Sequence, residues 1–187
     1  MADPYLLILT GPPGAGKSTV GRAVAVASDP SVSLESDWMW TTVVRGHVPP
    51  WEPAADAQNR AMLRASLAAA SRMCAAGYAT VLEGIIGPWH WDLVLDEVGP
   101  VLERVSYVVL RPGLEVCLER AAGRADRDPD RPALRDTAPI RHLWDQFRDL
   151  GPFERYAVDT TGLDTPDTVS AVEEALASGS HRVTAGT

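Results

Sequence analysis

The segment Thr10-Gly-Pro-Pro-Gly-Ala-Gly-Lys-Ser-Thr19 decides the fold of this chain. It lies between the apolar run at residues 5–9, which we predict as a strand, and residues 17–27, which we predict as a helix. Residues 11–18 match the pattern Gly-x-x-x-x-Gly-Lys-Ser, which binds nucleotide phosphates when it joins a strand to a helix. The strand, the loop and the helix follow in that order here, so the segment predicts a phosphate-binding loop.

This loop offers three kinds of group to a triphosphate. Its glycines let backbone N–H groups and the helix N-terminus converge on phosphate oxygens. Lys17, the only lysine in the chain, is predicted to reach the β- and γ-phosphates as a mobile ammonium, and Ser18 to supply a hydroxyl to Mg²⁺. The expected cofactors are ATP and Mg²⁺. The predicted nucleotide-binding residues of the loop are Gly11, Gly14, Ala15, Gly16, Lys17, Ser18 and Thr19.

Length and composition indicate one domain. The chain has 187 residues, of which 45% are hydrophobic, and no apolar run approaches the roughly 18 residues of a membrane helix. We expect a domain over residues 1–178, a frayed tail at 179–187 and a cytoplasmic location. The net charge of -8 disfavours nucleic acid, and no membrane partner is expected. Cys74 and Cys117 lack metal-ligand spacing and are predicted to be core residues.

Apolar runs alternate with helical patterns along the chain. Short apolar strands separated by helices indicate a parallel sheet covered on both faces, so we predict an α/β fold. Residues 124–139 are dense in Arg, Asp and Pro and are predicted to form a mobile lid. The predicted strands are 5–9, 31–36, 78–82, 105–110 and 156–158, and the predicted helices are 17–27, 54–76, 90–103, 114–125, 140–150 and 169–177.

Two classes of phosphate-loop protein fit this sequence poorly. Guanine recognition in GTPases needs a second lysine, which the chain lacks. Ring ATPases need an apolar strand that ends in Asp-Glu. Residues 93–97, Leu-Val-Leu-Asp-Glu, imitate such a strand, but the apolar spacing from Trp91 to Leu102 predicts an amphipathic helix instead.

Acidic residues follow two of the predicted strands. Glu83 ends the third strand, and residues 35–37, Glu-Ser-Asp, end the second. Ligands of parallel α/β sheets bind at the carboxyl ends of the strands, so these acids should share a crevice with Gly11.

These motifs resemble those of the small P-loop kinases of the nucleoside-monophosphate-kinase, shikimate-kinase and gluconate-kinase group. The chain is most similar to the chloramphenicol phosphotransferase-like antibiotic-resistance kinases. The resemblance covers most of the chain and rests on the loop at 11–19, Asp37, the strand end at 81–84, the Arg-rich lid and Val-Asp-Thr-Thr-Gly at 158–162. It implies a five-stranded parallel sheet of order 2-3-1-4-5 that binds MgATP and transfers the γ-phosphoryl group to a hydroxyl.

The resemblance also implies roles for single residues. Asp37 would accept the hydroxyl proton or hold that oxygen in line, unless it is a helix N-cap. Glu83 would orient Mg²⁺-bound water or substrate, unless it makes only backbone bonds. Arg120 and Arg124 share a helical face and would neutralise charge on the nucleotide, unless they belong to a solvated surface. The predicted catalytic residues are Lys17, Asp37 and Arg124, and the predicted metal ligands are Ser18 and Glu83.

Five of the six tryptophans fall in two segments that follow the second and third strands: Trp38, Trp40, Trp51, Trp89 and Trp91. A pocket concentrates large aromatic residues beside a few polar groups, so an aromatic or apolar acceptor is expected. About half of these tryptophans are expected to hold helices onto the sheet instead. The predicted substrate-binding residues are Asp37, Trp40, Glu83, Trp89 and His90.

The sequence therefore predicts an ATP-dependent phosphotransferase that acts on a hydroxyl of a small molecule, such as an antibiotic or other natural product. Residues 84–91 lack the Gly-Phe-Pro-Arg-like run of adenylate kinases, which disfavours a nucleoside monophosphate as acceptor. Two alternatives stay open. One is a nucleotide-binding ATPase or switch that acts through a protein partner. The other is a nucleotide, nucleotide-sugar or nucleic-acid-end kinase that resembles the zeta-toxin type, although the acidic chain argues against a polynucleotide. The acceptor and the oligomeric state are not fixed by the sequence.

Overall fold

The computed structural model describes residues 3–127 and 137–184. These residues form a five-stranded sheet in which each neighbouring pair is parallel, with the order β2-β3-β1-β4-β5. This arrangement confirms the α/β fold and the strand order that the resemblance implied. The strands are β1 (Leu6–Thr10), β2 (Ser31–Glu35), β3 (Ala79–Glu83), β4 (Val105–Leu110) and β5 (Ala157–Val158).

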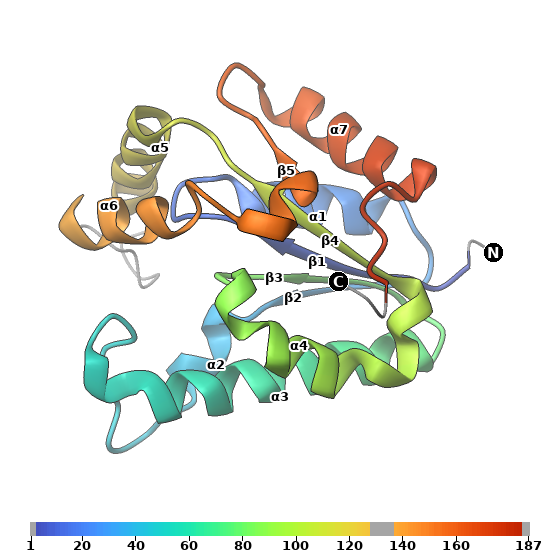
Figure 1. Ribbon diagram of the computed structural model, residues 1–187, viewed down its shortest axis with the longest axis horizontal. Coiled ribbons are helices and arrows are strands. Elements are labelled where there is room, and N and C mark those ends of the chain that lie inside the picture. The colour runs from blue at the N-terminus through green and yellow to red at the C-terminus, as the bar shows by residue number, and fades with distance from the viewer. Residues whose placement is uncertain (1–2, 128–136, 185–187) are drawn as a thin grey trace.

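Helices cover both faces of the sheet (Figure 1). Helices α1 (Lys17–Val26) and α7 (Thr165–Ser178) pack on one face, and α3 (Asp56–Ala75) and α4 (Trp91–Val98) pack on the other. Three further helices lie near the carboxyl ends of the strands, at the left of Figure 1. They are α2 (Asp37–Thr41), α5 (Leu114–Arg127) and α6 (Thr137–Gln146).

Strand β1 shows why the sheet is central. Leu6 and Ile8 pack into the core beneath α3 and α4, whereas Leu7 and Leu9 pack into the core beneath α1 and α7, and all four are fully buried. Burying one such side chain contributes about 1.5–3 kcal/mol. The continuous apolar runs of the sequence are therefore strands that are buried on both faces. Cys74 and Cys117 are free and buried, which confirms them as core residues.

The structure corrects the ends of two predicted segments. The helix predicted at 90–103 stops at Val98, and Gly99–Arg104 continues as a 3-10 helix because Pro100 has no N–H for the α-helical ladder. The first and last residues of the predicted lid, 124–139, are helical, because α5 continues to Arg127 and α6 begins at Thr137. Residues 128–136 lie outside the described part of the chain.

Part of the predicted frayed tail pairs with the sheet. Strand β5 contacts only the last two residues of β4, so the first half of β4 has an open edge. The Tyr107 N–H donates to the His181 carbonyl at 3.0 Å, and the Val183 N–H donates to the Val105 carbonyl at 2.9 Å. This pairing satisfies backbone groups that would otherwise be unpaired at an edge. Within residues 3–127 and 137–184, no helix combines the length and apolar character needed to cross a membrane.

Candidate active site

The predicted phosphate-binding loop connects β1 to α1. Gly14 in this loop has φ +82°, and a side chain there would place its Cβ 2.2 Å from the backbone oxygen of Cys117 in α5. Only glycine fits this close approach. Helix α1 begins at Lys17 without a side-chain N-cap, so the N–H groups of its first turn can face an anion. The Lys17 ammonium donates to the carbonyls of Gly11 and Pro12, at 3.0 Å each.

This geometry fits a triphosphate with Mg²⁺. The ammonium of Lys17 is held at the mouth of the loop, where it can move toward phosphate oxygens. Ser18 follows in the first turn of α1 and is half-buried. Its hydroxyl and the carboxylates of the neighbouring strand ends are the oxygen ligands that Mg²⁺ prefers.

Two of these carboxylates come from neighbouring positions in the sheet. Glu35 of β2 and Glu83 of β3 are partners in the parallel register, so both side chains leave the sheet on the same face. A Cβ on Gly21 of α1 would lie 3.7 Å from the Glu83 Cβ, which places that face toward α1. Glu83 is only 5% exposed. The sequence placed Glu35 within the acidic stretch at the end of the second strand, but only the register identifies it as the neighbour of Glu83.

Asp37 is the first residue of α2 and is exposed to solvent. The N-cap of this helix is Ser36, which makes no side-chain cap hydrogen bond. Asp37 is therefore not the N-cap, and the alternative explanation for this residue is removed.

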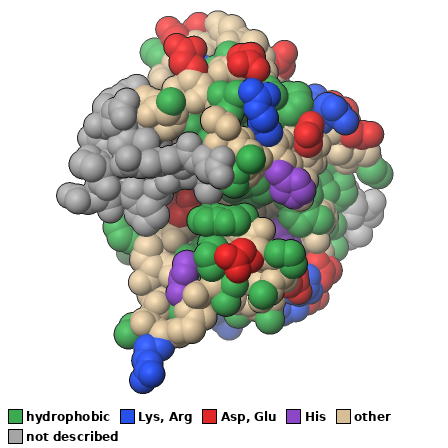
Figure 2. Space-filling model, turned by 90° about the vertical axis from the view of Figure 1, so that its left-hand side faces the viewer, with side chains coloured by type: hydrophobic (Ala, Val, Ile, Leu, Met, Phe, Trp, Pro, Cys, Tyr) green, Lys and Arg blue, Asp and Glu red, His purple; other side chains and the backbone are tan. Residues whose placement is uncertain are grey.

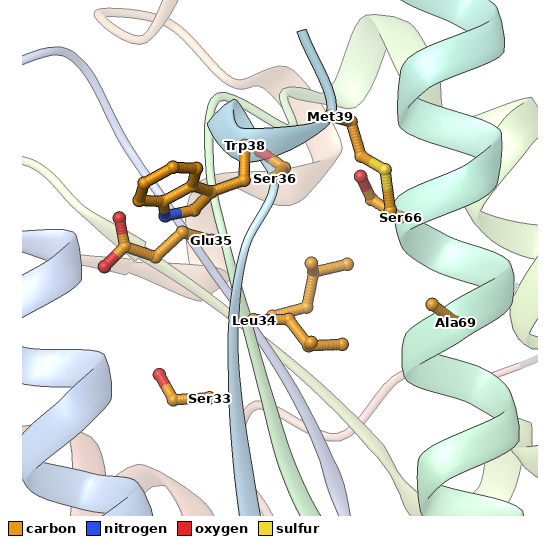
Figure 3. Close-up of a pocket in the computed structure, with 9 residues that line it drawn as sticks. Ser33, Leu34, Glu35, Ser36, Trp38, Met39, Ser66 and Ala69 are labelled. Atoms are coloured by element: carbon orange, nitrogen blue, oxygen red, sulfur yellow. The ribbon is translucent and has the colours of Figure 1, made fainter. Parts of the chain in front are cut away.

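A cavity of about 260 Å³ lies beside the end of β2, between α2 and α3 (Figure 3). Leu34 and Met39 line it on the side of α3, and the indole of Trp38 lies near the Glu35 carboxylate on the other side of β2. Trp38 is 61% exposed. The end of β2 thus combines an acidic and an aromatic side chain.

The segment between β3 and α4, residues 84–90, forms a second loop, which we call the acceptor loop because it contains Trp89 and His90, two of the predicted acceptor-binding residues. Trp89 in this loop is 41% exposed, and its ring packs edge-on against Phe147 with 5.1 Å between centroids. A Cβ at Gly87 would lie 2.2 Å from the Trp89 ring, so the absence of a side chain at Gly87 makes room for the indole. The loop therefore presents a large aromatic ring that is partly exposed to solvent.

His90 ends the acceptor loop, and its ring lies 5.8 Å from that of Trp89. Burial lowers the pKa of His90, the charge of Arg60 lowers it further, and Asp92 and Asp56 oppose these effects. The imidazole is therefore neutral at pH 7. In the part of the chain that the structure describes, its buried Nδ1 has no hydrogen-bond partner.

The other predicted aromatic residues have different environments. Trp91 is 9% exposed and packs edge-on against Tyr107 and Phe153, so it belongs to the core. The Trp40 indole donates to Asn59 Oδ1 at 2.8 Å, which ties α2 to α3. Trp51 is 58% exposed. Of the predicted acceptor residues, Trp89 and His90 thus share one loop, and Trp40 supports the neighbouring helices.

The predicted lid arginines lie on α5. Arg120 donates to the Leu163 carbonyl at 3.2 Å, in the loop between β5 and α7. The same loop contacts the start of α5, because the Gly113 N–H donates to Thr161 Oγ1 at 2.9 Å. Arg124 follows one turn later on α5, and its side chain lies outside the described part of the chain.

Figure 2 views the molecule from the left-hand side of Figure 1, where the carboxyl ends of the strands lie. Hydrophobic and histidine side chains gather there around a hollow between the upper and lower parts of the molecule. The fold and this arrangement of loops define a P-loop protein of the small-kinase type.

Comparisons with known proteins agree with this class. The chain belongs to the AAA domain family AAA_33, whose model matches residues 6–150. A shikimate kinase from Pseudomonas syringae pv. syringae (strain B728a) is 29% identical over 171 residues, which cover 82% of this chain and 83% of that protein.

Two solved structures share the fold. A gluconokinase from Sinorhizobium meliloti 1021 superimposes with a TM-score of 0.65 at 19% identity, over 96% of this chain and 95% of that one. The Deinococcus radiodurans tunicamycin resistance protein superimposes with a TM-score of 0.62 at 18% identity, over 94% and 95% of the two chains. The protein is thus an enzyme, a small-molecule kinase of the P-loop class.

Proposed function

We propose that this kinase transfers the γ-phosphoryl group of MgATP to a hydroxyl of an apolar or aromatic small molecule, such as an antibiotic or other natural product. One observation carries the proposal. Strands β1 and β3 are neighbours, so the phosphate-binding loop and the acceptor loop leave the same edge of the sheet side by side. A triphosphate on Lys17 would then face an acceptor on Trp89. Such a reaction uses ATP and belongs in the cytoplasm.

Each residue of the site has its own role in this reaction. Lys17 and the N–H groups of the loop hold the phosphates, and Arg124 adds positive charge to the transferred group. Ser18 and Glu83 would hold Mg²⁺, which would neutralise charge on the phosphate oxygens. Asp37 accepts the proton of the acceptor hydroxyl or holds its oxygen in line. Positioning and charge neutralisation supply most of the catalysis.

The charges around the acceptor loop favour an uncharged acceptor. Shikimate and gluconate carry a carboxylate, which an arginine would recognise with two parallel hydrogen bonds. Arg60 of α3 lies close to His90, but it is bound to Asp92 at 2.6 Å. Arg64 is bound in the same way to Asp96 and Glu97, at 2.9 Å each. In the part of the chain whose side chains the structure describes, these two guanidinium groups tie α3 to α4, and on this basis we propose an acceptor without a carboxylate.

A thermal-shift screen tests this function. The full chain is heated with Mg²⁺, a non-hydrolysable ATP analogue and one member of a panel of hydroxylated compounds, including tunicamycin, shikimate and gluconate. A true acceptor raises the melting temperature beyond the effect of nucleotide alone, because it binds only the folded protein. Compounds that do so are incubated with ATP, and the phosphorylated product is detected by mass spectrometry.

Three results would contradict the proposal. If calorimetry detected no binding of MgATP at millimolar concentration, the protein would not be an ATP-dependent kinase. ATP hydrolysis that depends on a protein partner, without a phosphorylated small molecule, would indicate a switch. Preferred phosphorylation of shikimate or gluconate over uncharged alcohols would show that the acceptor site reads a carboxylate.

A further inference from the structure

Ile86, in the middle of the acceptor loop, has both of its backbone polar groups bound by side chains of other strands. Its N–H donates to the Thr10 hydroxyl oxygen at 2.9 Å, and its carbonyl accepts from the Tyr107 hydroxyl at 2.7 Å. Both hydrogen bonds are buried, and Ile86, Thr10 and Tyr107 are each fully inaccessible to solvent. Strands β1 and β4 therefore hold one residue of this loop from two sides.

The two hydroxyls are unusual in their surroundings. Thr10 follows four buried apolar residues of β1, and Tyr107 lies in a fully buried strand among valines. A buried backbone group that loses its hydrogen-bond partner destabilises the fold, so each hydroxyl contributes something that an apolar side chain of the same size could not. Burial raises the pKa of the Tyr107 phenol far above its usual value, so this hydroxyl keeps its proton and donates at any working pH.

The position of Ile86 relates these bonds to the chemistry. Thr10 immediately precedes Gly11, the first residue of the phosphate-binding loop. Ile86 lies three residues after Glu83 and three residues before Trp89. A bond from Thr10 to Ile86 thus ties the root of the loop that would hold the donor phosphate to the centre of the loop that would hold the acceptor.

We propose that Thr10 and Tyr107 are positioning residues for phosphoryl transfer, which fix the acceptor loop relative to the phosphate-binding loop through Ile86. This inference rests on the proposed function. Transfer requires the two reacting atoms to approach within about 3–3.5 Å in line, and a shift of about 1 Å can reduce the rate about 100-fold. Thr10 and Tyr107 are both fully buried, so neither hydroxyl can reach a ligand, and their loss should impair transfer without weakening nucleotide binding.

Single-hydroxyl deletions test the inference. Thr10→Val and Tyr107→Phe remove one hydroxyl each while keeping the volume of the side chain, and Thr10→Ser restores the hydroxyl. Tyr156→Phe is the matched control, because Tyr156 is also a fully buried tyrosine, and its hydroxyl accepts from the Arg155 guanidinium and donates to the Arg182 carbonyl. Each variant is compared with the unaltered chain in three measurements.

The first measurement is amide hydrogen exchange of residues 84–90, which should be faster in Thr10→Val and Tyr107→Phe than in Tyr156→Phe. The second is the dissociation constant of a non-hydrolysable ATP analogue with Mg²⁺, which should stay within about twofold in all variants because the phosphate-binding loop is intact. The third is turnover of the acceptor selected by the thermal-shift screen. Its kcat should fall about tenfold in both deletions, and Thr10→Ser should recover it.

The outcomes separate the two proposals. If the unaltered chain phosphorylates an acceptor and the two deletions match Tyr156→Phe in exchange and in kcat, the positioning role is wrong while the proposed function stands. If the deletions weaken nucleotide binding as much as transfer, the hydroxyls support the whole fold and the inference also fails. If the unaltered chain phosphorylates no acceptor, the proposed function fails. Amide hydrogen exchange at residues 84–90 that is unchanged in Thr10→Val and Tyr107→Phe would refute the positioning role independently of any activity.

Discussion

The phosphate-binding loop and the acceptor loop leave neighbouring strands, but they are built in different ways. The phosphate-binding loop is shaped by its own backbone, with glycines at its close contacts and one ammonium held by two of its carbonyls. The acceptor loop is held by hydroxyls of Thr10 and Tyr107 and presents the exposed ring of Trp89.

This difference separates the recognition of nucleotide, which is general, from the recognition of the acceptor, which is specific. Backbone N–H groups recognise any triphosphate, whereas an exposed aromatic ring and a neutral imidazole recognise particular acceptors. Changes in the first loop should therefore abolish the reaction with every acceptor. Changes in the second loop should alter the choice of acceptor and spare nucleotide binding.

The largest effect is expected for Lys17→Ala. Because the only ammonium of the loop is lost, the rate of phosphoryl transfer should fall by at least about 1,000-fold. A coupled assay for ADP measures the rate, and circular dichroism checks that the fold is intact. Lys17→Arg serves as the control for charge alone, and it should not restore activity because a planar guanidinium does not replace a compact ammonium at this site. Substantial turnover by Lys17→Ala would show that the loop does not hold the transferred phosphate.

Asp37→Asn should have the next largest effect. The amide keeps the size of the side chain but cannot accept a proton, so kcat should fall about 100-fold or more with little change in nucleotide affinity. The melting temperature should stay close to that of the unaltered chain, because Asp37 is exposed and does not cap α2. Normal turnover by this variant would exclude Asp37 from the chemistry and turn attention to Glu35.

The sequence predicted the phosphate half of the molecule more fully than the acceptor half. The phosphate-binding loop was recognisable because its function depends on glycines and a lysine at fixed spacing, and this spacing can be read directly from the sequence. The buried strands were equally clear, since β1 and β4 are continuous apolar runs. The strand order itself came from the resemblance to known kinases.

The acceptor half depends on contacts between distant residues, which spacing does not show. Trp91 and Trp89 are two positions apart, yet one packs in the core and the other is exposed. The pairing of Glu35 with Glu83 follows from the register of β2 and β3. The bonds of Thr10 and Tyr107 to Ile86 join three segments of the chain and have no local sequence signal.

Trp89→Ala should weaken binding of the acceptor and leave the affinity for nucleotide unchanged. Loss of this partly exposed ring should raise the KM for an aromatic acceptor about tenfold, which corresponds to about 1.4 kcal/mol of binding. Trp51→Ala is the matched control, because Trp51 is also an exposed tryptophan but lies outside the acceptor loop. Steady-state kinetics with varied acceptor distinguishes the two variants. Equal effects of both substitutions would mean that Trp89 is not part of the acceptor site.

The smallest effect is expected from the titration of His90. Burial, followed by the charge of Arg60, lowers the pKa of this residue in the folded protein. In the unfolded chain a histidine titrates near its ordinary value of about 6.5, so below that pH the unfolded state binds more protons than the folded state. The contribution of His90 to stability is therefore lost as the pH falls below about 6.5, and it levels off below the folded pKa.

His90→Asn removes this titration. Between pH 7 and pH 5.5 the variant should lose less in melting temperature than the unaltered chain, because its side chain cannot take up a proton. His181→Asn is the comparison, since burial also lowers the pKa of His181 but its backbone pairs with β4 away from the acceptor loop. Both variants should flatten the stability profile, and only His90→Asn should also change the pH dependence of the acceptor KM. An unchanged KM profile in His90→Asn would place this imidazole outside the acceptor site and leave recognition to the exposed aromatic ring.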